Sequence, residues 1–322
     1  MRQSTRPCLA FAFSCLLVTA VAQAQAAYEY SVIDYPGAEF TQVFGVNDHG
    51  IAVGNGYAIN GTYPFVYDIK TGALTDVANV AGYDSTAFLG ISDSGRLAGN
   101  VDDSVQSTRS GLVRDVQGAD TVFTHPDAVS ITEARGINNQ GLVSGSRDSA
   151  ERPGEYAFAF VHDPKSGTFA DFAESLITLA HGMNANGDVV GSAVFATGFE
   201  PTDPCPGLPG DPGVRRYGWL RTADGSLTYF IVNGEFTRAR GINDRGQIVG
   251  WVDDPSGGAF QKGFVVKLKG SGCQALTVPA GDLLELPGSV NTSPEGITNS
   301  GDVVGVAIDG TGVVHGFVAT PK

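Results

Sequence analysis

A ten-residue pattern with glycine at its first, sixth and tenth positions occurs six times along the chain. Its clearest copy is GINDRGQIVG at residues 241–250. The copies cover residues 45–54, 90–99, 136–145, 182–191, 241–250 and 296–305. Repeats with a period of 20–50 residues are typical of solenoids and propellers, in which each repeat is one supersecondary unit.

Each decamer predicts a β-hairpin. Its third residue has a side chain that can accept a hydrogen bond from the backbone two residues further on. These residues are Asn47, Ser92, Asn138, Asn184, Asn243 and Thr298. The invariant sixth glycine fits a type I turn followed by a left-handed residue. A calcium loop is the alternative, but it needs more acids at alternating positions, and Ala185 occupies the acidic position of the fourth copy.

Further apolar segments follow each decamer and predict two more strands. The third strands contain residues 64–66, 111–113, 159–161, 218–220, 263–265 and 316–318. The fourth strands contain residues 74–77, 121–124, 168–172, 227–232 and 275–278. Four short strands in about 46 residues match one propeller blade.

The ends of the chain favour closure of these blades into a ring. The sixth unit ends at Lys322 after its third strand, and the missing fourth strand is present at the front, over residues 30–34. We therefore expect an all-β, six-bladed β-propeller over residues 27–322, closed by the N-terminal strand beside Phe317. An open solenoid is the alternative, and it would need caps that the sequence does not show.

The repeats resemble the HAF family of bacterial extracellular repeat proteins. The resemblance is carried by residues 241–250 with Gly263-Phe264-Val265, and by residues 296–305 with His315-Gly316-Phe317. It covers nearly all of the chain after residue 26. It implies an exported repeat protein of propeller type, and it implies no reaction and no catalytic residue.

Residues 1–26 predict a secretory signal peptide. Arg2 and Arg6 precede an apolar stretch over residues 9–22, and two A-x-A cleavage sites follow it. The stretch is shorter than the roughly 20 residues that span a bilayer, although an uncleaved anchor is the alternative. We expect a periplasmic or extracellular protein with no other membrane span.

The charge of the chain limits its partners. Its 34 acids and 20 bases give a formal charge of −14, and loss of the two leader arginines makes this −16. Such a protein is repelled by phosphate, so we expect no nucleic-acid partner. We expect a monomer whose extracellular ligand is a carbohydrate or a protein.

Two cysteines remain after the leader is removed. In an oxidising compartment Cys205 and Cys273 would form a disulfide. The expected topology places Cys205 on one face of the ring and Cys273 near the other, between the third and fourth strands of blade five. A five-residue strand is roughly 17 Å long, so the sequence leaves the bond open.

The residue before each first glycine indicates a candidate ligand site. If the first strand of each blade is innermost, these residues lie at one mouth of the central channel. They are Phe44, Leu89, Arg135, His181, Arg240 and Glu295, with Glu133 and Arg238 two positions before the arginines. This charged cup could bind an anionic or hydroxyl-rich ligand. Structural ion pairs of Arg135 with Glu133 and of Arg240 with Glu295 are the alternative.

Blade four also carries a long, proline-rich excursion on the same face. Its tenth glycine is followed 28 residues later by Trp219, against 11 to 15 residues in the other blades. The excursion includes Glu200, Pro201, Asp203, Pro204, Cys205, Pro206, Pro209, Asp211, Pro212, Arg215 and Arg216. It is either a lid or partner-binding arm, or a tolerated surface insertion.

No catalytic motif, cofactor motif or metal-ligand spacing is present. The five histidines are scattered, so we predict no metal site. The hypothesis is an exported module that binds a ligand or partner. The alternatives are a polysaccharide lyase or hydrolase that uses the mouth residues for acid–base chemistry, and a structural envelope protein.

Overall fold

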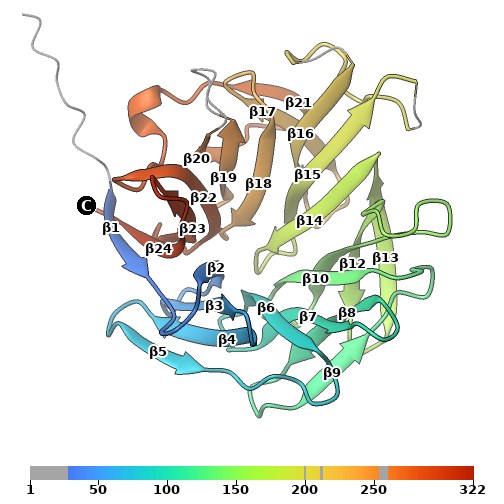
Figure 1. Cartoon of the computed structure of the whole chain (residues 1–322). Helices are drawn as coiled ribbons and strands as arrows, with labels where there is room; N and C mark the ends of the chain where they lie inside the picture. Colours follow the sequence, from blue (N-terminus) through green and yellow to red (C-terminus); the bar gives the residue numbers. More distant parts are fainter. Residues whose placement is uncertain (1–27, 199–200, 211–212, 254–259) are drawn as a thin grey trace, which may run out of the picture.

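The chain is a six-bladed β-propeller (Figure 1). The computed structural model describes residues 28–198, 201–210, 213–253 and 260–322, so the expected signal peptide lies outside the described residues. In every blade the first strand lies nearest the axis and the later strands follow outward. No helix in these four ranges is long and apolar enough to cross a membrane.

Blades one to three have four strands each. They are β2 (Phe40–Val46), β3 (Ile51–Ala58), β4 (Gly61–Asp68) and β5 (Ala73–Asp76); β6 (Ser85–Ile91), β7 (Leu97–Asp103), β8 (Thr108–Arg114) and β9 (Asp120–Phe123); and β10 (Thr132–Ile137), β11 (Val143–Arg147), β12 (Phe158–Asp163) and β13 (Thr168–Glu174).

Blades four to six depart from this pattern at their outer edges. Their strands are β14 (Ile177–Met183), β15 (Val189–Ala196), β16 (Val214–Arg221), β17 (Leu227–Val232) and β21 (Gly272–Leu276); β18 (Thr237–Ile242), β19 (Gln247–Asp253) and β20 (Gln261–Lys267); and β22 (Ser289–Ile297), β23 (Val303–Asp309), β24 (Val314–Pro321) and β1 (Tyr28–Ile33). A short 3-10 turn over Ala280–Asp282 precedes β22.

The N-terminal strand closes the ring, as expected. β1 pairs antiparallel with β24, and Val32 lies opposite Phe317. Tyr30 adds a ring contact with Phe317 at 6.2 Å between centroids. Its hydroxyl accepts a hydrogen bond from the Glu285 backbone at 3.2 Å. The last blade is therefore built from both ends of the propeller chain, which removes an open seam.

The decamer turns have the predicted conformation. All six sixth-position glycines have φ between +73° and +97°, where a side chain would be strained. In the fifth copy, Asn243 Oδ1 accepts hydrogen bonds from the backbone N–H groups of Arg245 and Gln247 at 3.1 and 2.9 Å. The side chain of the third residue thus stabilises the turn through hydrogen bonds, and the sixth-position glycine adopts the left-handed conformation that the turn requires.

The fourth residues of the decamers link neighbouring turns around the ring. The N–H of Asp48 donates to Asp93 Oδ1 at 2.8 Å, and the N–H of Asp244 donates to Asn299 Oδ1 at 3.0 Å. Asn299 donates in turn to Asp48, across the junction between the last and first blades. The fourth-position carboxylates and amides thus accept hydrogen bonds from the backbone of the neighbouring turn, which accounts for the recurrence of Asp or Asn there.

One link in this ring lacks its side-chain acceptor. Ala185 occupies the fourth position of its decamer, so it offers no side-chain oxygen to the N–H of Asn139. At the same junction Asn138 Nδ2 is buried without a hydrogen-bond partner, whereas the equivalent Asn47 Nδ2 donates to the Ser92 carbonyl at 3.1 Å. Among the junctions between decamer turns, the one between blades three and four therefore lacks hydrogen bonds that its counterparts form.

The first glycine allows the innermost strands to approach one another. A Cβ on Gly90 would lie 2.1 Å from the Arg135 carbonyl oxygen, and one on Gly241 would lie 2.8 Å from the Glu295 oxygen. Contacts under 3 Å are excluded by van der Waals overlap, so only glycine fits. The six first strands thereby form a narrow central channel.

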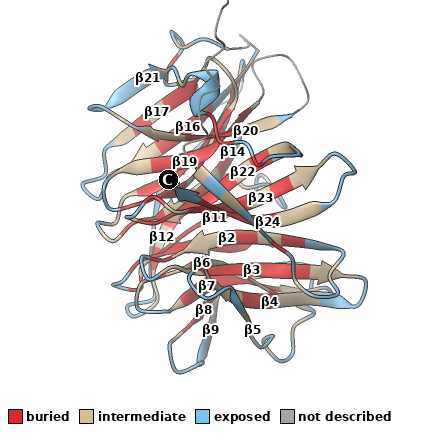
Figure 2. Cartoon of the chain, turned by 90° about the vertical axis from the view of Figure 1, so that its left-hand side faces the viewer, coloured by how far each residue is buried: buried red, intermediate tan, exposed pale blue. Residues whose placement is uncertain are grey.

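The hydrophobic core lies between the blades, where inner strands are mostly buried and outer edges exposed (Figure 2). The large apolar residue of every third strand is fully buried: Phe65, Leu112, Phe160, Trp219, Phe264 and Phe317. These side chains lie against tenth-position glycines; a Cβ on Gly54 would meet the Phe65 ring at 2.7 Å.

The prediction that residues 275–278 form the fourth strand of blade five is wrong. β21 pairs parallel with β17, so it becomes the fifth strand of blade four and leaves blade five with three. Asn233, which has φ of +56°, holds the end of this segment through hydrogen bonds to Leu276 and Val278. Leu276 and Val278 pack between blades four and five, and this packing draws the strand away from β20.

This rearrangement brings the two cysteines together. Cys205 and Cys273 form a disulfide with 5.8 Å between their Cα atoms. Because β21 lies on blade four, Cys273 reaches the excursion that carries Cys205. The sequence left the disulfide undecided because a fourth strand of blade five would hold Cys273 near the face opposite Cys205. Cys273 does not lie in that blade, so this separation does not apply.

Candidate functional site: the charged mouth of the channel

The six residues that precede the first glycines all line the central cavity: Phe44, Leu89, Arg135, His181, Arg240 and Glu295. A β-bulge places them there. Val43 pairs with Gly54 and Gly45 pairs with Val53, so Phe44 is the extra, unpaired residue. The same shift occurs at Leu89, Arg135, Arg240 and Glu295, and in blade four it covers both His181 and Gly182. A bulge redirects a side chain that would otherwise follow the strand alternation.

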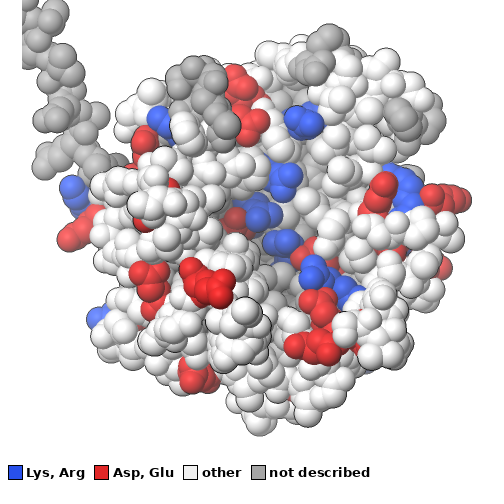
Figure 3. All heavy atoms as spheres, in the orientation of Figure 1, with Lys and Arg blue, Asp and Glu red and all other residues white. Residues whose placement is uncertain are grey.

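Basic side chains gather at the centre of this face of the ring (Figure 3). We call this end of the channel, where the first strands begin, the mouth. The volume of the cavity is about 70 Å³. Ligand pockets commonly occupy about 300–1,000 Å³, so the cavity itself admits only a small group such as a carboxylate, and the rest of a sugar-sized ligand would lie outside it. Phe44 and Leu89 form its apolar side.

Both ion pairs considered from the sequence are present. Arg135 Nη2 lies 3.0 Å from Glu133 Oε1, and Arg240 Nε lies 2.8 Å from Glu295 Oε2. Both acids are buried. Burial acts to lower the pKa of Arg135, but Glu133 and Glu295 hold it above its ordinary value. These pairs keep the guanidinium groups in fixed positions at the mouth.

His181 is an uncharged member of the cluster. Its ring is buried, and Arg240 Nη1 lies 3.1 Å from Nδ1 and 3.0 Å from Nε2. Burial, and then the charges of Arg240, Arg135 and Arg238, lower the pKa of His181 well below 6.5. At neutral pH it is therefore a neutral polar group with a lone pair beside a cation.

Arg238 lies beside the mouth, outside the lining of the cavity, and forms no ion pair within 4 Å among the described residues, although Glu295 and Asp253 act on its charge from further away. Its guanidinium lies 4.9 Å from the Trp251 ring centroid and 5.1 Å from that of Phe236. Its Nε–H is buried and donates to no acceptor among the described residues. Burial, followed by the charge of Arg240, lowers its pKa to about 10, so Arg238 is still cationic at neutral pH.

Several charged and polar residues near the mouth, outside the lining of the cavity, were not predicted from the sequence. Arg109, on β8, lies 2.8 Å from Asp102 and 3.9 Å from Glu133. Its Nη1 lies 3.3 Å from the Tyr156 hydroxyl. Burial raises the pKa of Tyr156 to about 12, so this hydroxyl stays protonated as a donor. Third strands and loops lack the repeat signal of the decamers, so the sequence offered no position to compare.

The blade-four excursion is anchored to its blade. The Tyr217 hydroxyl donates to Asp203 at 2.9 Å, and Arg215 Nη1 donates to the Leu208 and Gly210 carbonyls at 3.0 Å. The disulfide through Cys205 adds a covalent tie. Glu200, Asp211 and Pro212 lie outside the described residues. The remaining excursion is a fixed wall beside β16.

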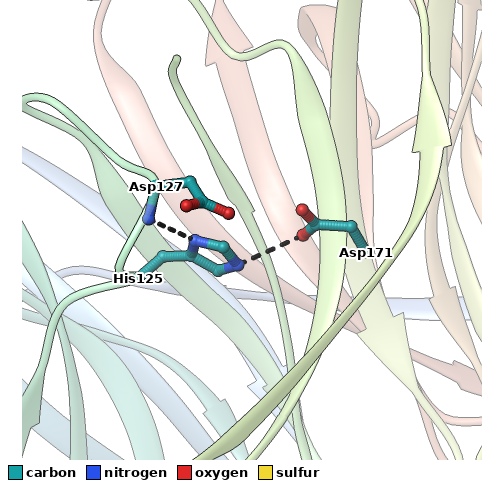
Figure 4. Close-up of side chains that lie close together, drawn as sticks. All are labelled: His125, Asp127 and Asp171. Atoms are coloured by element: carbon teal, nitrogen blue, oxygen red, sulfur yellow. Dashed lines mark hydrogen bonds and ion pairs between the residues drawn. The ribbon is translucent and has the colours of Figure 1, made fainter. Parts of the chain in front are cut away.

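In the described ranges, one group of three side chains could share a cation: His125, Asp127 and Asp171 (Figure 4). The Asp127 N–H donates to His125 Nδ1 at 3.1 Å, so the ring proton is on Nε2, 3.3 Å from Asp171. Arg147 Nη2 already lies 2.6 Å from Asp171. Against the effect of burial, the hydrogen bonds from His125 and Arg147 lower the pKa of Asp171. The group is a structural network whose cation is Arg147.

No family model and no curated protein matches the chain. Among solved structures, YjhT is similar with a TM-score of 0.51 and 11% identity over 90% of this chain and 97% of that one. The β-propeller domain of the Trilobed protease from Pyrococcus furiosus has a TM-score of 0.47, 12% identity and coverage of 88% and 95%. Streptogramin B lyase has a TM-score of 0.47, 9% identity and coverage of 92% and 100%. At these identities the likeness concerns the fold alone.

Proposed function

We propose that the chain is an exported binding module whose mouth takes a small carboxylate-bearing ligand, with an acidic sugar as the best-fitting class. One observation carries this proposal. Arg238 forms no ion pair within 4 Å among the described residues, with Glu295 and Asp253 acting on it only from further away, and it is held near Arg240 in a protein of net charge −14. A half-buried guanidinium favours an anion, and its planar fork matches a carboxylate.

The other unsatisfied atoms of the mouth favour a ligand with hydroxyl groups as well. Glu133 Oε2 and Arg135 Nε are both buried without a hydrogen-bond partner. The first can only accept and the second can only donate. A sugar hydroxyl does both, so an acidic sugar offers a carboxylate to Arg238 and hydroxyls to this pair.

Calorimetry with glucuronate and glucose tests the proposal. We expect glucuronate to bind and glucose to bind far more weakly, because the carboxylate is the group that the mouth selects. R238Q should weaken glucuronate binding by about tenfold or more, since hydrogen bonds to charged groups contribute about 1.5–3 kcal/mol. R245Q is the matched control, because Arg245 is an exposed cation in a turn on the opposite face.

Three results would count against the proposal: no binding of any carboxylated sugar, equal binding of glucose, or equal effects of R238Q and R245Q. A glycan array that mixes neutral and acidic sugars extends the comparison beyond one probe. Turnover of a bound glycan would replace the binding module by an enzyme.

A further inference from the structure

A second hollow lies next to the mouth, between the blade-four excursion and the start of β18. Its volume is about 180 Å³, and its lining includes Pro209, Arg215, Arg216 and Phe236 together with the acids Glu235 and Asp253. All of these residues are at the ends of elements that face the same side as the mouth. We call this hollow the side groove.

Arginine side chains connect the mouth with the side groove. Arg216 lies 5.2 Å from the centroid of the Phe236 ring, and Arg238 lies 5.1 Å from the same centroid. Arg238 is in turn close enough to Arg240 for the charge of Arg240 to lower its pKa. These contacts connect Arg240 through Arg238 to Arg216. On this face Lys and Arg side chains gather at the centre and continue outward from it (Figure 3).

Arg216 resembles Arg238 in having no ion pair within the described protein, whereas its neighbour Arg215 is occupied by carbonyls and lies 3.6 Å from Asp203. Glu235 and Asp253 also line the groove, and the charges of Arg216 and Arg238 act on Asp253 without forming an ion pair within 4 Å. Two arginines beside one ring repel one another, and an acid beyond 4 Å offsets this repulsion only in part. Anions placed between or beside them relieve that repulsion.

The wall of the groove is held in place before any ligand arrives. The Cys205–Cys273 disulfide and the Tyr217–Asp203 hydrogen bond fix the excursion on one side. On the other side Phe236 packs edge-on against Trp251, with ring centroids 5.6 Å apart. A preformed groove costs less ordering on binding than a mobile loop does.

We propose that the ligand is a linear acidic oligosaccharide, with one uronate unit in the mouth and the next units along the side groove against Arg216. This deepens the proposed function and rests on it. Arginines spaced along a surface match a chain that repeats its carboxylate, and Asp253 among them suits a chain that also carries hydroxyl donors. Nucleic acid fits less well, because the net charge of −14 opposes a polyphosphate at longer range.

The test compares chain lengths and charge together. Glucuronate and its β-1,4-linked oligomers, from the disaccharide to the hexasaccharide, are titrated into the protein, with cello-oligosaccharides of equal length as neutral controls. We expect the affinity for oligoglucuronates to rise by about tenfold or more over the monosaccharide, because adjacent subsites act together. The neutral series should show no such rise.

Variants separate the two subsites. R216Q should remove most of the gain with length and leave glucuronate binding unchanged, while R238Q should weaken both. R245Q should change neither, and thermal unfolding of each variant confirms that it is folded. A short single-stranded DNA and an acidic peptide, each titrated in parallel, report the other polyanion classes.

The outcomes are distinguishable from failure of the proposed function. If glucuronate binds but longer oligomers bind no better, or if R216Q behaves as the wild type with oligomers, the side groove is not a subsite and only this inference fails. If neither monomer nor oligomer binds, the mouth assignment fails as well. Tighter binding of DNA or the acidic peptide than of the oligomers overturns the glycan assignment.

Discussion

Arg240 Nη1 lies 3.0 Å from Nε2 and 3.1 Å from Nδ1 of His181, at the centre of the mouth. The contact joins blades four and five through residues that are both bulged from their strands. A protonated imidazole here would place a new charge against a buried guanidinium. The arrangement therefore depends on a neutral histidine, and this has a consequence for stability.

We expect the protein to lose stability as pH falls below about 6.5, with His181 as one cause. The unfolded chain takes up a proton near the ordinary value of 6.5, whereas the folded protein, whose pKa is well below it, does not. Proton uptake thus favours the unfolded state, by up to about 1.4 kcal/mol per pH unit between the two pKa values.

H181N tests this expectation through denaturant unfolding at pH values on either side of 6.5. The variant should show a smaller loss of stability with falling pH. H49N is the matched control, because His49 is an exposed turn residue on the opposite face. The same pH slope in H181N and the wild type would contradict the assignment.

The sequence predicted those parts of the fold that the decamer repeat determines. The decamers gave the six blades, and the position of residues 30–34 relative to the sixth unit gave the closure that β1 and β24 now show. The six positions at the mouth followed from the same register. Their ability to bind a ligand stays a prediction.

Features outside the repeat could not be predicted, for physical reasons. Chain order placed residues 275–278 in blade five, but packing of Leu276 and Val278 between two blades moved the strand to blade four. Pairs of residues that change together between blades could not be recognised from the sequence either. Between blades one and two, Asn55 Oδ1 accepts a hydrogen bond from the Phe88 N–H at 3.0 Å. Between blades five and six, Trp251 takes the position of Asn55 and Pro294 takes that of Phe88. Proline has no N–H, so no acceptor is needed there.

Completing the ring of turn contacts should stabilise the protein. A185N supplies the missing acceptor for the N–H of Asn139 without adding a fourth carboxylate to Asp48, Asp93 and Asp244. One added hydrogen bond contributes about 0.5–1.5 kcal/mol, which corresponds to a rise in Tm of roughly 1–4 °C. A185S, whose side chain is too short to span the junction, is the control, and an equal rise in both variants would argue against the ring contact.

The close approach of the innermost strands predicts a severe effect at a first-position glycine. G90A places a methyl group 2.1 Å from the Arg135 carbonyl oxygen, so strands of neighbouring blades must move apart. We expect a loss of about 1–3 kcal/mol or more in unfolding free energy. In G310A the added methyl meets nothing within 4 Å, and the change should stay within about 0.5 kcal/mol. Equal denaturation midpoints for the two variants would show that the channel wall tolerates expansion.

The disulfide should stabilise one blade edge more than the whole ring. In the double variant C205A/C273A, β21 is still paired with β17 through backbone hydrogen bonds, but the excursion is no longer tied to it. We expect a loss of about 2–4 kcal/mol at most. Hydrogen exchange should become faster in residues 201–210 and 272–276, with blades one and two unchanged. Uniform acceleration across all six blades would indicate that the bond supports the ring as a whole.

Closure by the N-terminal strand predicts that this strand can be supplied in trans. A chain that begins after Asp34 leaves the β24 edge unpaired and loses the contact between Tyr30 and Phe317. We expect a lower Tm and a concentration-dependent tendency to associate through the open edge. A synthetic peptide of residues 28–34 should restore much of the Tm, because an extended peptide can add a strand to an exposed edge. A peptide of the same composition in scrambled order should not restore it. If truncation leaves the Tm unchanged, the pairing of β1 with β24 contributes little and the ring is stable without its seam.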